Sequence, residues 1–250
     1  MSADLFEYAL RLGDDSLVLG QRLSEWCAKS PEMELDVALM NVSLDLFGRA
    51  RGFLTLAAEA EGQGRDEDTL AFLRDVGDFR NVLLVEQPNG DFAETIARQL
   101  LFDAVDLPFM EALTRSTNET LAAIAAKAVK ESAYHLRFSA EWAIRLGDGT
   151  DESHRRMQAA LDEMWPYVHE LFEMDDLETR LVAAGVAVDR EALRPAFEQR
   201  IDAVLAEATL RKPETSWRPT GARRGEHSEH LGFLLTEMQW MQRAYPNMEW

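Results

Sequence analysis

Apolar residues recur at intervals of three and four along almost the whole chain, which is the periodicity of helices with one face against a core. Glu, Ala, Leu, Arg and Met, which all favour helices, dominate the same stretches. No stretch shows the sustained apolar–polar alternation, rich in β-branched residues, that is typical of a half-buried strand. The sequence therefore predicts an all-α protein.

Turn and capping residues divide this pattern into helices of different length. We expect helices over about 15–28, 33–61, 91–114, 117–146, 151–172, 189–210 and 227–244, with shorter helical pieces over 66–87. Two long helices, a crossover and two more long helices form the chain order of a ferritin-like four-helix bundle. We therefore expect a single ferritin-like helical domain over 1–250, with a core bundle at about 15–146 and additional C-terminal helices over about 151–250.

Charge excludes two classes of partner. The 26 Lys plus Arg residues against 45 Asp plus Glu residues give a formal net charge of −19. Such a chain repels nucleic acid and an anionic membrane surface alike, so neither is an expected partner. The first residues have no basic and apolar segments of a signal peptide, and no apolar run reaches the ~18 residues that span a bilayer.

The chain contains one cysteine, Cys27, which cannot form an intrachain disulfide. A reducing, cytoplasmic location is therefore expected. Cys27 follows Trp26 on a face that we expect to be buried, which favours a structural thiol over a nucleophile.

The inward faces of the four long helices carry few polar residues. The first expected helix presents Ser16 with Leu19, Leu23 and Trp26, and the second presents Arg49 as the one charge in an apolar stripe that includes Leu46. The third stripe has Asp103 as its one charge, and the fourth has Ser132, His135 and Ser139. A di-iron bundle needs about four carboxylates and two histidines on such faces. These stripes supply one carboxylate and one imidazole, so we predict no metal site in this chain.

Alternatives exist for the polar residues. Asp103 could instead be a capping or solvent-facing residue, and a core position is the preferred interpretation of His135. His227 and His230 are spaced as half of a zinc site, but no further Cys or His ligand lies nearby in the sequence. A set of basic residues in and beside the irregular stretch is either solvated or contacts an acidic partner or an anionic ligand such as the phosphate of coenzyme A. These residues are Arg211, Lys212, Arg218, Arg223 and Arg224.

Several segments resemble the C subunits of bacterial phenylacetyl-CoA epoxidase, the multicomponent ring-1,2-epoxidase of phenylacetate breakdown. The resemblance is carried by residues 14–26, 44–51, 79–92, 126–137, 145–157, 226–232 and 238–246, so it extends over nearly the whole chain. It implies a ferritin-like structural subunit that pairs with a di-iron catalytic A subunit. The A subunit's two Glu-x-x-His motifs correspond to Leu46–Arg49 and Ser132–His135 here, its aspartate to Asp103, and its first-helix glutamate to the neighbourhood of Ser16 and Asp15.

The same resemblance implies a wider oxygen- and NADPH-dependent system. The iron belongs to the A subunit, flavin and an iron–sulfur centre belong to a reductase, and the system also includes a B subunit. This chain would be non-catalytic, with no catalytic residue and no cofactor of its own, would stabilise the A subunit, and could form a homo-oligomer when alone. The alternative function is a divergent di-iron oxidase or oxygenase that is active in its own right.

Arg49 and Asp103 lie on stripes that face each other if the chain packs as a ferritin-like bundle. Because an unpaired buried charge is costly, we predict that the guanidinium pairs directly with the carboxylate, with Ser132 and His135 close to the pair. Arg49→Ala is then expected to cost about 3–5 kcal/mol of stability.

Overall fold

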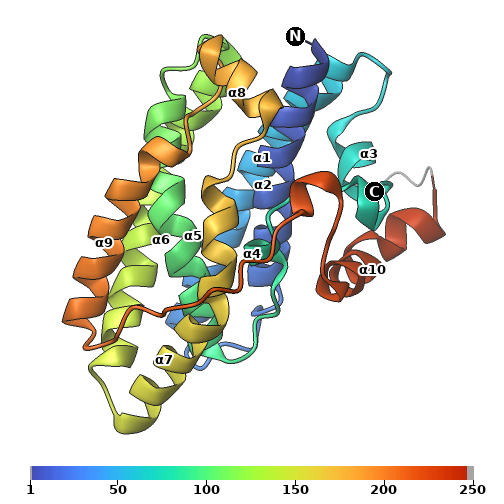
Figure 1. The fold of residues 1–250 in the computed structure, drawn as a ribbon. Helices are drawn as coiled ribbons and strands as arrows, with labels where there is room; N and C mark the ends of the chain where they lie inside the picture. The colour runs from blue at the N-terminus through green and yellow to red at the C-terminus, as the bar shows by residue number, and fades with distance from the viewer. Residues whose placement is uncertain (1, 247–250) are drawn as a thin grey trace. The chain divides into compact units, whose positions relative to one another are not determined.

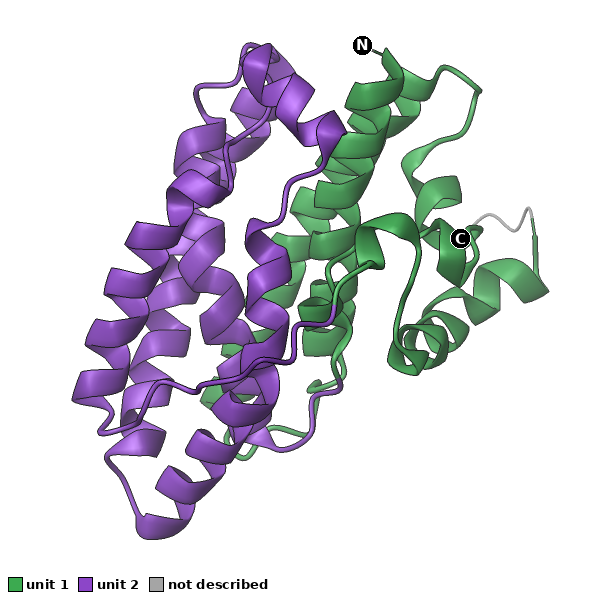
Figure 2. Cartoon of the chain, in the orientation of Figure 1, with its two compact units in different colours: residues 1–87, 220–250 green, residues 88–219 purple. Residues whose placement is uncertain are grey.

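The computed structural model describes residues 2–246, and helices, turns and loops make up that part of the chain (Figure 1). The prediction of an all-α protein is therefore confirmed. The chain order of hairpin, crossover and hairpin is consistent with a ferritin-like helical bundle. Figure 2 colours two compact units, of which unit 1 comprises residues 1–87 and 220–250 and unit 2 comprises residues 88–219.

Unit 1 is built on a hairpin of α1 (Ser2–Ser24) and α2 (Met33–Glu61). The crossover after α2 contains α3 (Glu67–Phe72), the 3-10 helix η1 (Val76–Asp78) and α4 (Leu83–Glu86). The chain later returns to this unit with η4 (Ala222–Arg224) and α10 (Glu229–Ala244), and α10 packs on α3, η1 and α4. Unit 1 thus joins two stretches of sequence that lie far apart.

The first helix begins at Ser2, thirteen residues before the predicted start, and it ends at Ser24. The helix runs through Gly13-Asp14-Asp15, whose composition is typical of a break. Here the glycine serves close packing, since a Cβ at Gly13 would lie 2.7 Å from Leu54 Cδ2 of α2. The early end of the helix leaves Cys27 in an exposed turn, so the prediction that Cys27 is buried is wrong.

Unit 2 is built on a second hairpin, α5 (Phe92–Leu113) and α6 (Glu119–Gly147), which lies close to its predicted bounds. Asp91 caps α5 by accepting from two backbone N–H groups, and Asn118 caps α6 by accepting from Leu121 N–H. The remaining elements of unit 2 are α7 (Asp151–Met164), η2 (Trp165–Phe172), α8 (Asp176–Ala183), η3 (Glu191–Leu193) and α9 (Arg194–Glu207). The helix predicted over 151–172 is therefore two elements, because Pro166 tightens the chain into a 3-10 helix, and α8 was missed.

One helix in each unit is buried on nearly all sides. In α1 every residue from 8 to 20 is buried, and in α5 most residues from 93 to 113 are. Both helices carry charged residues within these stretches, such as Asp14 on α1 and Asp103 on α5. A buried charge requires partners, so the hydrogen bonds of these two helices identify the polar centres of the molecule.

Candidate functional site

The polar centre of unit 2 lies between α5 and α6. Asp103 Oδ1 accepts from Gln99 Nε2 at 2.6 Å, and Asp103 Oδ2 accepts from Ser139 Oγ at 2.8 Å. Farther along α5, Asp106 Oδ2 accepts from Ser132 Oγ at 2.6 Å. All five side chains are buried, so the bonds are shielded from water. The hairpin therefore holds two carboxylate–hydroxyl contacts about one helical turn apart.

Sequence reasoning placed Asp103, Ser132, His135 and Ser139 on inward faces, and all four are buried. The alternative of a solvent-facing Asp103 is therefore wrong. Ser139 is the α6 partner of Asp103, whereas Ser132 bonds to Asp106, a carboxylate that the stripe analysis missed. Asp106 lies three residues after Asp103, and this spacing was the available signal that both face α6.

Unit 1 carries the other positions that correspond to iron ligands in the implied A subunit. Ser16, Leu46 and Arg49 are buried, and Ser16 Oγ donates to the carbonyl of Leu12 in its own helix at 3.0 Å. Arg49 belongs to unit 1 and Asp103 to unit 2, and their direct pairing stays a prediction. Leu46 offers no donor atom and Arg49 carries a positive charge, so these two positions do not fit iron.

Among the residues that the structure describes, no group of three or more His, Cys, Asp or Glu side chains is arranged to hold a metal ion. Over the same part of the chain, no helix combines the length and the apolar character that crossing a bilayer demands.

The polar centre of unit 1 surrounds α1 and consists of ion pairs. Asp14 is bound by both terminal nitrogens of Arg74, one of them at 2.9 Å from Oδ2, and it also accepts from Arg80 N–H. Asp15 accepts from Arg223 Nη2 at 2.7 Å. Asp15 was considered as a neighbour of a lost ligand position, and this geometry gives it a structural role.

A further buried contact of unit 1 involves Glu86, which is completely buried. Its Oε2 lies 3.0 Å from His227 Nδ1 and its Oε1 accepts from Ser228 N–H at 2.7 Å. The other nitrogen of His227, Nε2, lies 2.9 Å from the carbonyl oxygen of Phe79. Both ring nitrogens of His227 are thus engaged within the chain, which does not favour the zinc interpretation of His227 and His230.

The basic residues of the irregular stretch also form specific contacts. Arg223 binds Asp15, Arg211 pairs with Asp162 at 2.8 Å, and Lys212 pairs with Asp202 at 2.9 Å. The interpretation as a solvated side chain is therefore wrong for Arg223, whereas Arg211 is 68% exposed and stays solvated beside its acidic partner. Arg223 is mostly buried and donates hydrogen bonds to residues of α1 and to the carbonyl of Arg80 in the crossover. These bonds hold the returning chain on the rest of unit 1.

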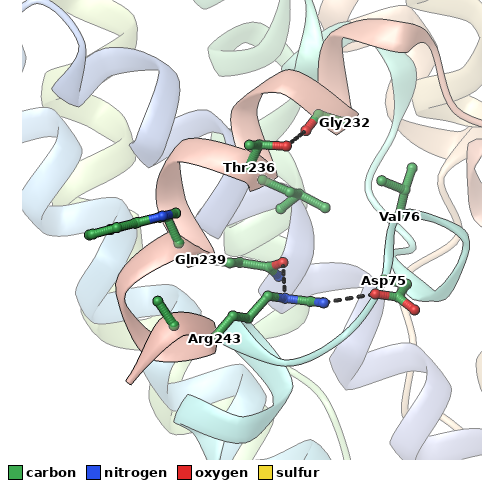
Figure 3. Close-up of a pocket in the computed structure, with 9 residues that line it drawn as sticks. Asp75, Val76, Gly232, Thr236, Gln239 and Arg243 are labelled. Atoms are coloured by element: carbon green, nitrogen blue, oxygen red, sulfur yellow. Dashed lines mark hydrogen bonds and ion pairs between the residues drawn. The ribbon is translucent and has the colours of Figure 1, made fainter. Parts of the chain in front are cut away.

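A pocket of about 480 Å³ lies where α10 meets the crossover (Figure 3). Its polar wall is Arg243, whose guanidinium bonds to Gln239 Oε1 at 3.0 Å and to Asp75 Oδ1 at 2.9 Å. The guanidinium also donates to the carbonyl of Arg74 at 2.7 Å. The bonds from Arg243 to Arg74 and Asp75 thus hold α10 on the crossover.

Comparison with known proteins identifies the family. All 250 residues match the family model described as phenylacetic acid catabolic protein. The chain belongs to this family. One relative, the C subunit of 1,2-phenylacetyl-CoA epoxidase from Escherichia coli (strain K12), is 52% identical to it over 246 residues, which cover 98% of this chain and 99% of that protein. The resemblance inferred from the sequence segments is confirmed.

Proposed function

We propose that this chain is the non-catalytic, structural C-type subunit of a 1,2-phenylacetyl-CoA epoxidase complex in phenylacetate breakdown. The observation that carries the proposal is the 52% identity, from end to end, to a protein named as the C subunit of that enzyme. At such identity and coverage two chains share fold and surface, so a shared place in a complex is the simplest inference.

The non-catalytic part of the proposal rests on the two buried hairpins. The positions that correspond to iron ligands in the implied A subunit include Leu46 and Arg49, which do not fit iron. Each carboxylate oxygen of Asp103 accepts a hydrogen bond, one from Gln99 and the other from Ser139. Such bonds are typical of a buried carboxylate with a structural role. We therefore assign the iron to the A subunit, and the flavin and the iron–sulfur centre to the reductase.

The proposed partner is the A subunit, and the B subunit and the reductase complete the system. A permanent helical complex of this kind is expected to bury about 2,000 Å² or more. The A subunit expressed without this chain should be less soluble or less active.

The test is co-expression of this chain with the A subunit, followed by affinity purification and metal analysis of each chain alone and of the complex. We expect a stable complex whose iron content equals that of the A subunit alone. Stoichiometric iron on this chain, with oxygen-dependent turnover, would instead establish the alternative of a divergent di-iron oxidase. An A subunit that is equally soluble and active alone would overturn the structural role.

A further inference from the structure

The α2 helix carries a second apolar stripe in addition to its buried one. Its members are Met33, Val37, Met40, Leu44 and Phe47, spaced four, three, four and three residues apart, and we call them the α2 seam. This spacing is that of the a and d positions of a coiled coil. Met33 is 79% exposed, Val37 54% and Leu44 65%, whereas Met40 and Phe47 are half-buried, so three of the five seam residues lie open to solvent. A row of exposed large apolar residues on one helix face marks an interaction surface.

The C-terminal end of the seam leads into an apolar pocket within unit 1. The pocket has a volume of about 260 Å³, and Phe47 forms part of its wall together with Leu17 of α1, Phe72 of α3 and Met238 of α10. The exposed row thus ends at a hollow large enough for one apolar side chain. Such a hollow at the end of a seam is where an anchoring residue of a docked helix would bind.

The charges beside the seam show what kind of helix fits. In the heptad register, Glu34 and Asp36 occupy the flanking e and g positions, which select coiled-coil partners. Residues 30–48 contain four acidic side chains, Glu32, Glu34, Asp36 and Asp45, and no Lys or Arg. A second copy of this chain on the same face would bring acid against acid, which disfavours self-pairing.

We propose that the α2 seam is the docking face for a helix of a different subunit, one with apolar heptad residues and with Lys or Arg at its flanking positions. The proposal rests on the proposed function and deepens it, because it assigns the surface through which this chain joins another component of the complex. Basic flanking residues would meet Glu34 and Asp36 at the edge of the contact, where complementary charge speeds association and selects the partner.

The experiment measures binding of the full chain to the A subunit, to the B subunit and to the reductase, each purified separately. The test variant is Leu44→Glu, and the matched control is Phe233→Glu on α10, because Leu44 is 65% and Phe233 68% exposed. Both substitutions replace an exposed side chain, and circular dichroism with a thermal melt checks that both variants fold. We expect Leu44→Glu to weaken binding of one component at least tenfold and Phe233→Glu to change it less than twofold.

A second variant tests the charges. Glu34→Gln removes one flanking acid without changing the size of the side chain, and we expect a shallower dependence of the association rate on salt than in the wild type. A salt dependence equal to that of the wild type would overturn the basic character assigned to the partner helix.

The remaining outcomes separate this proposal from the proposed function. If Leu44→Glu binds every component that the wild type binds, the A subunit included, as tightly as the wild type does, the seam is wrong and the proposed function stands. Binding to the B subunit alone, lost in Leu44→Glu, supports the seam and overturns pairing with the A subunit. A wild-type chain that binds no component overturns both. Sedimentation of the chain alone gives the last outcome: a dimer that Leu44→Glu dissociates, with binding of the components unchanged, would make the seam a contact between copies.

Discussion

The polar centre around α1 in unit 1 and the polar centre between α5 and α6 in unit 2 solve the problem of a buried carboxylate in different ways, although elsewhere in unit 2 the buried Glu178 pairs with Arg190. In unit 1, Asp14, Asp15 and Glu86 each meet a cationic or ionisable group from another part of the chain: Arg74, Arg223 and His227. In unit 2, Asp103 and Asp106 accept from Ser139 and Ser132 on the next helix, and Asp103 also accepts from Gln99 on its own helix.

The difference follows from chain order. Unit 1 must join residues 1–87 to residues 220–250, and two of the three contacts just named link those stretches. Removing one member of a buried ion pair leaves the other charge without compensation, whereas removing a hydroxyl donor leaves the carboxylate its other bonds. Polar substitutions should therefore cost more in the polar centre around α1 than in the polar centre between α5 and α6.

The largest effect is expected at Asp14, whose side chain is fully buried against Arg74. Asp14→Ala leaves the guanidinium of Arg74 without its counter-charge and the backbone N–H of Arg80 without its acceptor. It should therefore lower the free energy of unfolding by about 3–5 kcal/mol. Urea denaturation followed by circular dichroism measures the change. The double variant Asp14→Leu with Arg74→Met removes both charges and is expected to recover most of the loss, because paired apolar replacements are often neutral. A double variant as unstable as Asp14→Ala would show that the pair itself is not the cause.

A smaller loss is expected at His227, which bonds to Glu86 and to the carbonyl of Phe79. His227→Ala should cost about 2–3 kcal/mol, because Glu86 keeps its bonds to Ser228 and Asn81. The effect should be local to the returning chain, so trypsin should cleave after Arg224 sooner than in the wild type. His230→Ala is the control, since no side-chain bond of Glu86 involves it. Equal cleavage rates in the wild type and in His227→Ala would show that the pair does not anchor this segment.

Unit 2 provides the contrasting measurement. Ser139→Ala removes one donor from Asp103 and should cost about 1–2 kcal/mol, and Ser132→Ala should cost about the same by removing the donor to Asp106. Both serines are fully buried, so the two variants are a matched pair. Urea denaturation in the same buffer as for Asp14→Ala allows direct comparison. A loss at either serine as large as that at Asp14 would remove the distinction between the units.

The features that local chemistry controls were predictable from the sequence. Helix periodicity placed the bounds of α2, α5 and α6 within about two residues, and the side chains of Asp91 and Asn118 cap the starts of α5 and α6. The start of α1 was missed because the role of Gly13 depends on Leu54, which lies forty-one positions later in the sequence. Helix periodicity also placed Asp103, Ser132 and His135 on inward faces, and the three side chains are buried.

Contacts between distant segments were beyond the sequence analysis. The bonds from Arg223 to Asp15 and from His227 to Glu86 join residues more than 140 positions apart, and no periodicity connects them. In the sequence, Arg223 appeared instead as part of a basic cluster, and His227 appeared as part of a possible zinc half-site. The spacing of the α2 seam was visible, but only the exposed fractions of Met33, Val37 and Leu44 separate it from a core stripe.

The smallest effect is expected at Glu94, a partly buried acid in the first turn of α5 in unit 2. Burial raises the pKa of this carboxyl above its ordinary value of 4.5, and the negative charges of Glu163 and Asp91 raise it further. Because the pKa is higher in the folded chain than in the unfolded chain, folding favours the protonated form. The resulting stabilisation is fully present below the unfolded pKa and is lost as the pH rises through the folded pKa.

At pH 7 the wild-type chain therefore carries an unfavourable charge that Glu94→Gln removes. The gain in stability should stay below about 0.5 kcal/mol, because solvent still screens the charge of a group that is only partly buried. At pH 4 the acid is mostly protonated in the folded chain and the advantage of the glutamine should be smaller. Paired urea titrations of the wild type and Glu94→Gln at the two pH values measure the difference, and a glutamine variant that is less stable at pH 7 would contradict the assigned direction. Such a result would mean that the charge of Glu94 stabilises the N-terminal end of α5 more than its burial destabilises it, since an acid in the first helical turn is favoured by the helix dipole.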